Sequence, residues 1–211
     1  MKRLLCFAML GIICSLPCAF AQQEFGVKAG VNLNVNKTYE MYDSFSGRST
    51  TAGRRTVARF MGGLYGSFHV ANNFYVQPEL LYSQQYNMIK NSGKADGGYW
   101  HSLYSGKVDY LNIPVFLQYE ATDGLKIGAG PQFGFPIYTP EMVDGAPNIL
   151  ESMRAFDVGV AAEISYRIRG LGLGVFARYS EGLSNIAKKE KGSDKNRLFS
   201  FGLSYAVSEL F

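Results

Sequence analysis

The sequence predicts an all-β fold: an eight-stranded antiparallel up-and-down transmembrane β-barrel with short periplasmic turns and long extracellular loops. Eight segments of roughly ten residues alternate apolar and polar side chains, and strands of that length cross a bilayer at a tilt. The connections between these segments are alternately long and short. After residue 21, no stretch is long and apolar enough for a spanning helix, so a sheet that crosses lipid has to close on itself.

Residues 1–21 are predicted to be a cleaved signal peptide, and residues 22–211 the barrel domain. Two basic residues are followed by an apolar stretch and by Ala19-Phe20-Ala21, a small-x-small cleavage pattern. All three cysteines lie in this segment, so the mature chain has no disulfide framework. A lipoprotein anchor at Cys14 or Cys18 is the alternative, although the residues before these cysteines suit lipidation poorly.

The first three strands are predicted at 25–34, 59–70 and 74–85. Apolar residues occupy alternate positions in each, and the residues between them are mostly glycine or polar. A polar segment follows the first strand, whereas Ala71-Asn72-Asn73 is a tight turn between the second and third. Residues 86–107, rich in Asn, Gly, Ser and Lys, are predicted to form a second long loop.

The stretch Asp109–Ile137 is predicted to be an antiparallel hairpin that supplies the fourth and fifth strands. Its two alternating runs are joined by Thr122-Asp123-Gly124, an acidic turn that contains glycine. Residues 155–167, 171–181 and 198–207 alternate in the same way and give the last three strands. Residues 138–152 and 183–196 are the remaining long loops.

Four prolines conflict with regular strands. Pro78, Pro114, Pro131 and Pro136 lie within or at the end of the predicted strands. Proline cannot donate a ladder hydrogen bond, and a closed barrel has no edge strand to hold it. We therefore expect β-bulges or strand ends at these positions.

A soluble barrel with its apolar face inward would show the same alternation. Three features favour the membrane barrel. The polar face is rich in glycine, which makes room for long neighbours inside a narrow barrel but weakens an exposed strand. Aromatic residues gather near the strand ends, as in interfacial girdles, and the long loops all fall on one side.

Charged residues on the polar face would then point into the lumen. They are Lys28, Arg59, Glu79, Lys126, Asp157, Glu163, Arg167 and Arg178. Both signs are present, and isolated charges in a tight interior are costly, so these side chains have to pair or be hydrated. We expect a salt-bridged plug rather than an ion pathway, because side chains fill an eight-stranded barrel.

The sequence predicts no catalytic, cofactor or metal site. A grouping of Ser67, His69 and Glu79 can be drawn, but no nucleophile motif accompanies it, and no pair of histidines has metal-ligand spacing. Without Lys2 and Arg3, the 21 basic residues fall to 19 against 17 acidic ones, a balance that does not indicate nucleic-acid binding.

The predicted loops hold candidate contact residues. Tyr99, Trp100 and Tyr104 could anchor an envelope or secretion partner, because exposed aromatic residues are good anchors. The basic residues Lys188, Lys189 and Lys191 could contact the anionic phosphates of lipopolysaccharide in the outer-membrane lipid. The alternative for this basic loop is a merely solvated segment.

Several motifs together resemble one family. They are FGVKAGVNLN (25–34), QPELLYS (77–83), YLNIPVFLQY (110–119), AGPQFGF (129–135), RYSEGLSNI (178–186) and GLSY (202–205). The chain resembles the Bacteroidota outer-membrane β-barrel family, whose members are described as porin-like or PorT-like. The resemblance implies an outer-membrane barrel and, in some members, support of protein secretion. The chain departs from the family at residues 206–211, which extend beyond the usual end after GLSY, but we still expect the barrel-assembly machinery to read the terminal Phe211. The resemblance brings no catalytic motif or cofactor.

These observations predict an outer-membrane protein with a structural, adhesive or secretion-accessory role and a filled lumen. The second interpretation is a narrow porin-like channel for small solutes, and the third is an outer-membrane enzyme. Conductance in planar bilayers separates the first two, because a filled barrel is nearly silent.

Overall fold

The computed structural model describes eight segments of the chain. They are residues 23–34, 39–43, 48–52, 58–95, 98–138, 155–168, 170–184 and 196–207. The predicted signal peptide and most of the two loops predicted at 138–152 and 183–196 lie outside these residues. No helix in the described segments is long and apolar enough to cross a membrane.

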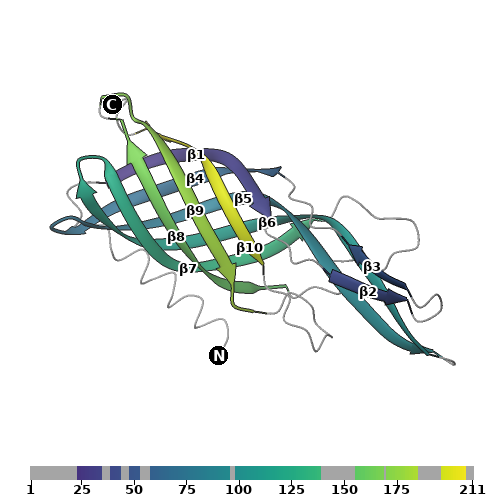
Figure 1. Ribbon diagram of the computed structural model, residues 1–211. Helices are drawn as coiled ribbons and strands as arrows, with labels where there is room; N and C mark the ends of the chain where they lie inside the picture. The colour runs from purple at the N-terminus through teal and green to yellow at the C-terminus, as the bar shows by residue number, and fades with distance from the viewer. Residues whose placement is uncertain are drawn as a thin grey trace, which may run out of the picture.

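Eight strands form a closed antiparallel barrel, which confirms the predicted fold class (Figure 1). The barrel strands are β1 (Gln23–Asn34), β4 (Ala58–Ala71), β5 (Phe74–Ala95), β6 (Gly98–Thr122), β7 (Leu125–Tyr138), β8 (Asp157–Arg167), β9 (Leu173–Gly182) and β10 (Arg197–Ala206). Strands that follow one another in this order are neighbours, and β1 completes the wall by pairing with both β4 and β10. The connectivity is therefore up-and-down throughout.

Apolar side chains cover the outside of the barrel and polar ones fill its interior. On β1, Val27 and Val31 are exposed, whereas Lys28 and Asn32, each of which directly follows one of these valines, are buried. Exposed apolar residues occur on all eight barrel strands; Leu64, for example, is 58% exposed. A soluble barrel would bury these residues, so the pattern confirms the membrane-facing assignment and excludes the soluble alternative.

The three short connections lie at one end of the barrel, here called the turn end. Asn72 and Gly124 have φ angles of +47° and +82°, conformations that tight turns require and that asparagine and glycine adopt most readily. Adjacent turns are joined by backbone hydrogen bonds, from Glu120 N to Asn73 O and from Arg167 N to Gly124 O, both 2.8 Å. The opposite end, from which the long connections leave, is the loop end.

The hairpin of β5 and β6 extends far beyond the barrel wall at the loop end (Figure 1). Pairing of β5 with β4 ends at Ser83, and pairing of β6 with β7 ends at Asp109, whereas β5 and β6 stay paired to Ala95 and Gly98. A separate two-stranded sheet, β2 (Tyr39–Asp43) with β3 (Arg48–Ala52), lies at the same end.

The prediction of a long loop at 86–107 was therefore wrong. The Asn, Gly, Ser and Lys content suggested a loop, but the segment also contains Tyr86, Ile89, Tyr99, Trp100 and Tyr104, residue types that favour strands. Its pairing partner is local, since each strand of the hairpin pairs with the other across a short connection. Local pairing allows the hairpin to continue without barrel neighbours.

The prolines behave differently from the expectation in three cases of four. Pro136 lies beside a register shift, because Tyr110 pairs with Pro136 and Asp109 with Tyr138. Pro78, Pro114 and Pro131 lie inside β5, β6 and β7 with no shift of register, so the predicted bulges or strand ends are wrong there. The ladder is instead interrupted next to them, for instance between the pairs Pro78–Val115 and Leu81–Asn112. Missing proline donors thus remove local pairing without inserting a residue.

Glycine makes room for large side chains inside the barrel. A Cβ atom on Gly26 would lie 2.4 Å from the ring of Tyr65, and one on Gly202 would lie 2.8 Å from the ring of Phe176. Both aromatic residues point into the lumen and are buried. The glycine-rich inner face is therefore what lets a narrow barrel hold aromatic rings and long charged side chains.

Candidate functional site in the barrel interior

Four charged side chains meet in the middle of the lumen. Lys28 Nζ lies 2.7 Å from Glu79 Oε1 and 2.6 Å from Glu163 Oε1. Arg178 Nη2 lies 2.6 Å from Glu79 Oε2, Arg178 Nε donates to Glu163 Oε2 at 2.9 Å, and Nη2 also pairs with Glu163. Each carboxylate therefore bridges both cations, and the central cluster, as we call these four residues, is neutral.

The central cluster spans the lumen because its members come from β1, β5, β8 and β9. All four side chains are 3% exposed or less. Three aromatic rings enclose them: Arg178 Cζ lies 4.8 Å from the centre of the Phe116 ring, and Lys28 Nζ lies 4.8 Å from the Phe176 ring and 5.5 Å from that of Tyr65. Such rings add cation–π attraction and exclude water, which strengthens the ion pairs.

Polar side chains fill the space next to the central cluster. Gln77 Nε2 donates to Glu79 Oε1 at 2.7 Å. Asn32 Nδ2 donates to Ser83 Oγ at 2.8 Å, while Ser200 Oγ donates to Asn32 Oδ1 at 2.7 Å. These bonds join β1, β5 and β10 through the interior and leave the buried amide well satisfied.

A second charged group lies at the turn end. Arg167 pairs with Glu24, and Tyr65 Oη donates to the same carboxylate at 2.8 Å. Lys126 Nζ lies 3.4 Å from Ser67 Oγ and 3.9 Å from the centre of the Tyr75 ring. A small cavity lies between these residues and Lys28, which belongs to the central cluster.

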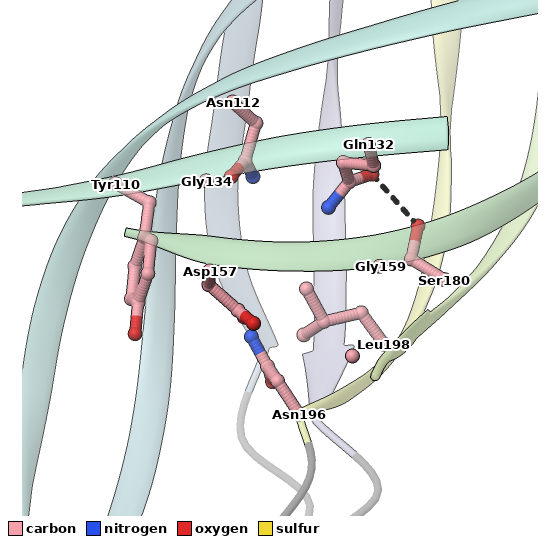
Figure 2. A pocket seen from close by; sticks show the side chains of 10 residues that line it. Tyr110, Asn112, Gln132, Gly134, Asp157, Gly159, Ser180, Asn196 and Leu198 are labelled. Atoms are coloured by element: carbon pink, nitrogen blue, oxygen red, sulfur yellow. Dashed lines mark hydrogen bonds between the residues drawn. The ribbon is translucent and has the colours of Figure 1, made fainter. Parts of the chain in front are cut away.

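A hollow at the loop end faces the other side of the central cluster; we call it the loop-end cup (Figure 2). Its lining consists of Tyr110, Asn112, Gln132, Gly134, Asp157, Gly159, Ser180, Gly182, Asn196 and Leu198. Ser180 Oγ donates to Gln132 Oε1 at 3.1 Å across the cup wall. A second hollow shares Asn112, Gln132, Ser180 and Leu198 with the loop-end cup and is also lined by Arg178, so it lies between the cup and the central cluster.

The structure distributes the predicted lumen charges over three levels. Lys28, Glu79, Glu163 and Arg178 form the central cluster, whereas Arg167 and Lys126 lie at the turn end. Asp157 lines the loop-end cup and accepts a hydrogen bond from Ser184 Oγ. Arg59 lies opposite the inward-facing Asn32, and its buried Nε has no hydrogen-bond partner in the described part of the chain.

The predicted loop contacts are only partly placed. Tyr99, Trp100 and Tyr104 belong to β6 rather than to a loop, opposite Lys94, Gly93 and Ile89 of β5. The basic residues Lys188, Lys189 and Lys191 lie outside the described residues.

Sequence reasoning missed several contributors to the interior. Glu24 was not among the predicted lumen charges because the first strand was predicted to begin at Phe25. The strand begins at Gln23, so Glu24 belongs to it and lies on the face opposite to Phe25. Phe116 and Phe176 were not among the predicted site residues, yet their rings lie beside Arg178 in the lumen. Asn196 was assigned to a loop; the structure places it in the lining of the loop-end cup.

The grouping of Ser67, His69 and Glu79 that can be drawn from the sequence does not assemble in the structure. His69 Nε2 is hydrogen-bonded to the Asn72 carbonyl, Ser67 contacts Lys126, and Glu79 pairs with Lys28 and Arg178. The three side chains thus have separate partners. Within the described segments, no group of three or more His, Cys, Asp or Glu residues could hold a metal ion.

A family model and solved structures match most of this chain. Residues 20–188 match the model of the family described as outer membrane protein beta-barrel domain. A search of curated proteins found no match. The structure is similar to Ail of Yersinia pestis, with 12% identity, 88% of this chain and 99% of that chain covered, and a TM-score of 0.45. It is also similar to OprG of Pseudomonas aeruginosa, with 12% identity, 89% and 96% covered, and a TM-score of 0.47.

Proposed function

Because the chain belongs to the outer membrane protein beta-barrel domain family, we propose that it is an outer-membrane barrel with a closed lumen and a structural, adhesive or secretion-accessory role. The loop end then faces outward and the turn end faces the periplasm, as is usual for such barrels. The predicted signal peptide, residues 1–21, delivers the chain, and the barrel-assembly machinery inserts it.

One observation supports a closed lumen above all others: the central cluster joins β1 and β5 to β8 and β9 across the lumen. Its four charges are mutually paired and almost fully buried, so no charged group there is left to coordinate a passing ion. Removing one partner would leave a buried charge uncompensated, which costs roughly 3–5 kcal/mol. A barrel sealed in this way serves as an anchor rather than as a path.

What the anchor holds is the extended hairpin of β5 and β6. It continues for eleven residue pairs, from Gln85–Val108 to Ala95–Gly98, past Ser83 and Asp109, where the pairing with the barrel neighbours ends. Its position at the loop end directs it away from the membrane on the outer side, where a partner protein or lipopolysaccharide would meet it first. This arrangement supports an adhesive or secretion-accessory role more than a purely structural one.

Conductance tests the closed lumen. Folded protein is inserted into planar bilayers, and its folded state is verified beforehand by heat-modifiable migration on a gel. We expect current near the baseline at all voltages that the bilayer tolerates. Steady single-channel steps from the unaltered protein would contradict the proposal and support the narrow channel.

Truncation tests the role of the hairpin. Replacing residues 88–105 by a two-residue Asn-Gly turn shortens the hairpin at the pair Asn87–Gly106 and leaves the barrel pairing intact. We expect the truncated protein to remain in the outer membrane but to lose adherence of the cells or secretion of an envelope substrate. Unchanged adherence and secretion would count against a role for the hairpin.

The second candidate function is a narrow channel for small solutes. It is favoured by the hollows on both sides of the central cluster, one toward Lys126 and one toward Asn196. Such a channel would open only if the central cluster rearranged, so the conductance measurement separates the two functions.

A further inference from the structure

The two strands of the extended hairpin lose their barrel neighbours at one level, which we call the junction. Pairing of β5 with β4 ends at Ser83, and pairing of β6 with β7 ends at Asp109, on the next rung of the β5–β6 ladder. Beyond the junction, β5 and β6 pair only with each other in the described part of the chain. A two-stranded hairpin has little stability by itself, so its direction depends on what holds its base.

Side chains on the outer face cross the junction. Tyr82 Oη, on the barrel side, donates to Asp109 Oδ2 at 2.6 Å, and Gln84 Nε2, on the hairpin side, donates to Tyr82 Oη at 3.1 Å. Lys107 Nζ, also beyond the junction, lies 3.6 Å from Asp109 Oδ1. That oxygen accepts no hydrogen bond from a described residue, so the attraction between the two charges is the contact there.

Asp109 is unusually buried for a residue on the outer face. Leu117 and Tyr119 occupy the same face of β6 and are 56% and 46% exposed, whereas Asp109 is 4% exposed. Burial of a carboxylate is costly unless it is hydrogen-bonded and paired. The contacts with Tyr82 and Lys107 meet this requirement at the junction.

A second set of hydrogen bonds crosses the junction on the inner face. Gln85, on the hairpin side, is buried; its Nε2 donates to Ser83 Oγ at 3.3 Å, and its Oε1 accepts a hydrogen bond from Asn196 Nδ2. Ser83 Oγ also accepts from Asn32 Nδ2 of β1 at 2.8 Å, and Asn196 O accepts from Gly182 N of β9 at 2.7 Å. The base of the hairpin is thus joined through the interior to β1 and β9, two strands with which β5 shares no ladder.

From this geometry we propose that the junction is a clamp that keeps the hairpin a stiff extension of the barrel wall, with Tyr82, Gln85 and Asp109 as its positioning residues. A sheet bends toward one of its two faces, and hydrogen bonds on both faces oppose both movements. The clamp therefore fixes the direction in which the hairpin leaves the barrel (Figure 1).

The clamp deepens the proposed contact role of the hairpin and rests on that role for its purpose. A partner that binds a preformed hairpin avoids the entropy cost of ordering it. The stiffness itself can be measured without any partner.

A similar group of side chains on β9 and β10 offers a matched comparison. Tyr179 Oη donates to Glu181 Oε2 at 3.0 Å, and Arg197 Nη2 lies 2.9 Å from Glu181 Oε1. A tyrosine, a carboxylate and a cation are thus in contact here as they are at the junction. Here, however, β9 ends at Gly182 and β10 begins at Arg197, so no described strand extends beyond the group.

The experiment measures the spread of distances between the hairpin and the barrel. Spin labels are attached to cysteines introduced at Ser92 of β5 and at the lipid-facing Val160 of β8; residues 22–211 contain no other cysteine. Pulsed electron paramagnetic resonance on the folded barrel in lipid nanodiscs gives the distance distribution. We expect a single narrow distribution when the clamp is intact. A broad distribution in that protein would overturn the proposal.

One double variant removes the clamp, and a single variant serves as its control. Tyr82→Phe/Gln85→Leu removes hydrogen bonds on both faces and nearly keeps the size of both side chains. We expect the distribution to broaden about twofold or more, because only the pairing of β5 with β6 then supports the hairpin. Tyr179→Phe removes the corresponding hydroxyl on β9 and should leave the width unchanged.

The remaining outcomes also decide the proposal. If the double variant lowers the temperature of unfolding but leaves the width unchanged, its side chains only stabilise the barrel and the clamp is rejected. Equal broadening by Tyr179→Phe rejects it as well. If the double variant does not fold, as judged by heat-modifiable migration, Tyr82→Phe decides alone: broadening supports the clamp and an unchanged width overturns it.

Truncation of the hairpin tests the contact role separately. A broad distribution with an intact clamp, together with lost adherence or secretion after truncation, rejects the clamp alone. A narrow distribution together with unchanged adherence and secretion after truncation rejects the contact role alone.

Discussion

Glu79 and Arg178 lie 99 positions apart in the sequence and meet in the centre of the lumen, with Arg178 Nη2 2.6 Å from Glu79 Oε2. Glu163 and Lys28 complete the same neutral group. The central cluster therefore ties four strands together through the interior, in addition to the backbone ladders of the wall. Its energetic weight and its role as a seal can be tested separately.

The first prediction concerns stability. Arg178→Met leaves Glu79 and Glu163 with Lys28 as their only cation, and we expect the free energy of unfolding to fall by roughly 3–5 kcal/mol. Urea titration of the barrel in detergent micelles measures it. The double variant Glu79→Gln/Arg178→Met keeps the balanced pair of Lys28 and Glu163, so its loss should be smaller than the sum of the two single losses. Strict additivity would contradict the shared ion pairing.

The second prediction concerns the outer face. Phe201 is 45% exposed near the middle of β10, on the lipid-facing side. Phe201→Arg places a charge near the bilayer midplane, and we expect it to cost about 2–4 kcal/mol of unfolding free energy in lipid vesicles. Phe201→Leu is the control and should cost far less. Equal effects of the two substitutions would mean that lipid does not contact this face.

The third prediction concerns the crowded interior. A Cβ atom on Gly174 would lie 2.6 Å from Ser204 Oγ, so Gly174→Ala should destabilise the barrel by about 1–3 kcal/mol through overpacking. Ser204→Ala removes that oxygen, and the double variant Gly174→Ala/Ser204→Ala should recover part of the loss. Thermal unfolding monitored on gels gives the comparison. An absence of any recovery would show that backbone crowding near Tyr166 dominates instead.

The fourth prediction contrasts the turn end with the centre. Glu24 and Arg167 are paired, but their side chains are 19% and 30% exposed. Glu24→Gln keeps an oxygen that can accept from Tyr65, so we expect a loss below about 1 kcal/mol. The loss should shrink further as salt is added, because screening acts on exposed pairs. A loss as large as that of Arg178→Met would contradict the ranking of the two sites.

The barrel fold could be predicted from the sequence, and so could the face of the barrel wall on which each strand side chain lies. A period of two assigns each residue to one face, so Lys28, Glu79, Glu163 and Arg178 could all be placed in the lumen without coordinates. Which of these charges meet could not be predicted, because that depends on the stagger between strands that are distant in sequence. Asp157 and Arg178 were both on the inner list, yet only Arg178 joins the central cluster.

Two features could not be predicted from residue composition or from the alternation of apolar and polar residues. The hairpin of β5 and β6 continues through residues 86–107 because its two strands pair with each other, and a loop-like composition concealed that pairing. Pro78, Pro114 and Pro131 interrupt the ladder without a bulge, since neighbouring pairs on either side hold the register. Both outcomes depend on pairing energies between strands, which a single sequence does not display.

The most direct test of a lumen sealed by paired charges is the current through matched barrels in planar bilayers. The unaltered protein and the variant Glu79→Ala/Arg178→Ala are compared after both are shown to be folded. The unaltered barrel should stay at the baseline, and the variant should show discrete openings, because the hollows on either side of the central cluster would then join. Steady current through the unaltered barrel, or silence from a folded variant, would contradict the account.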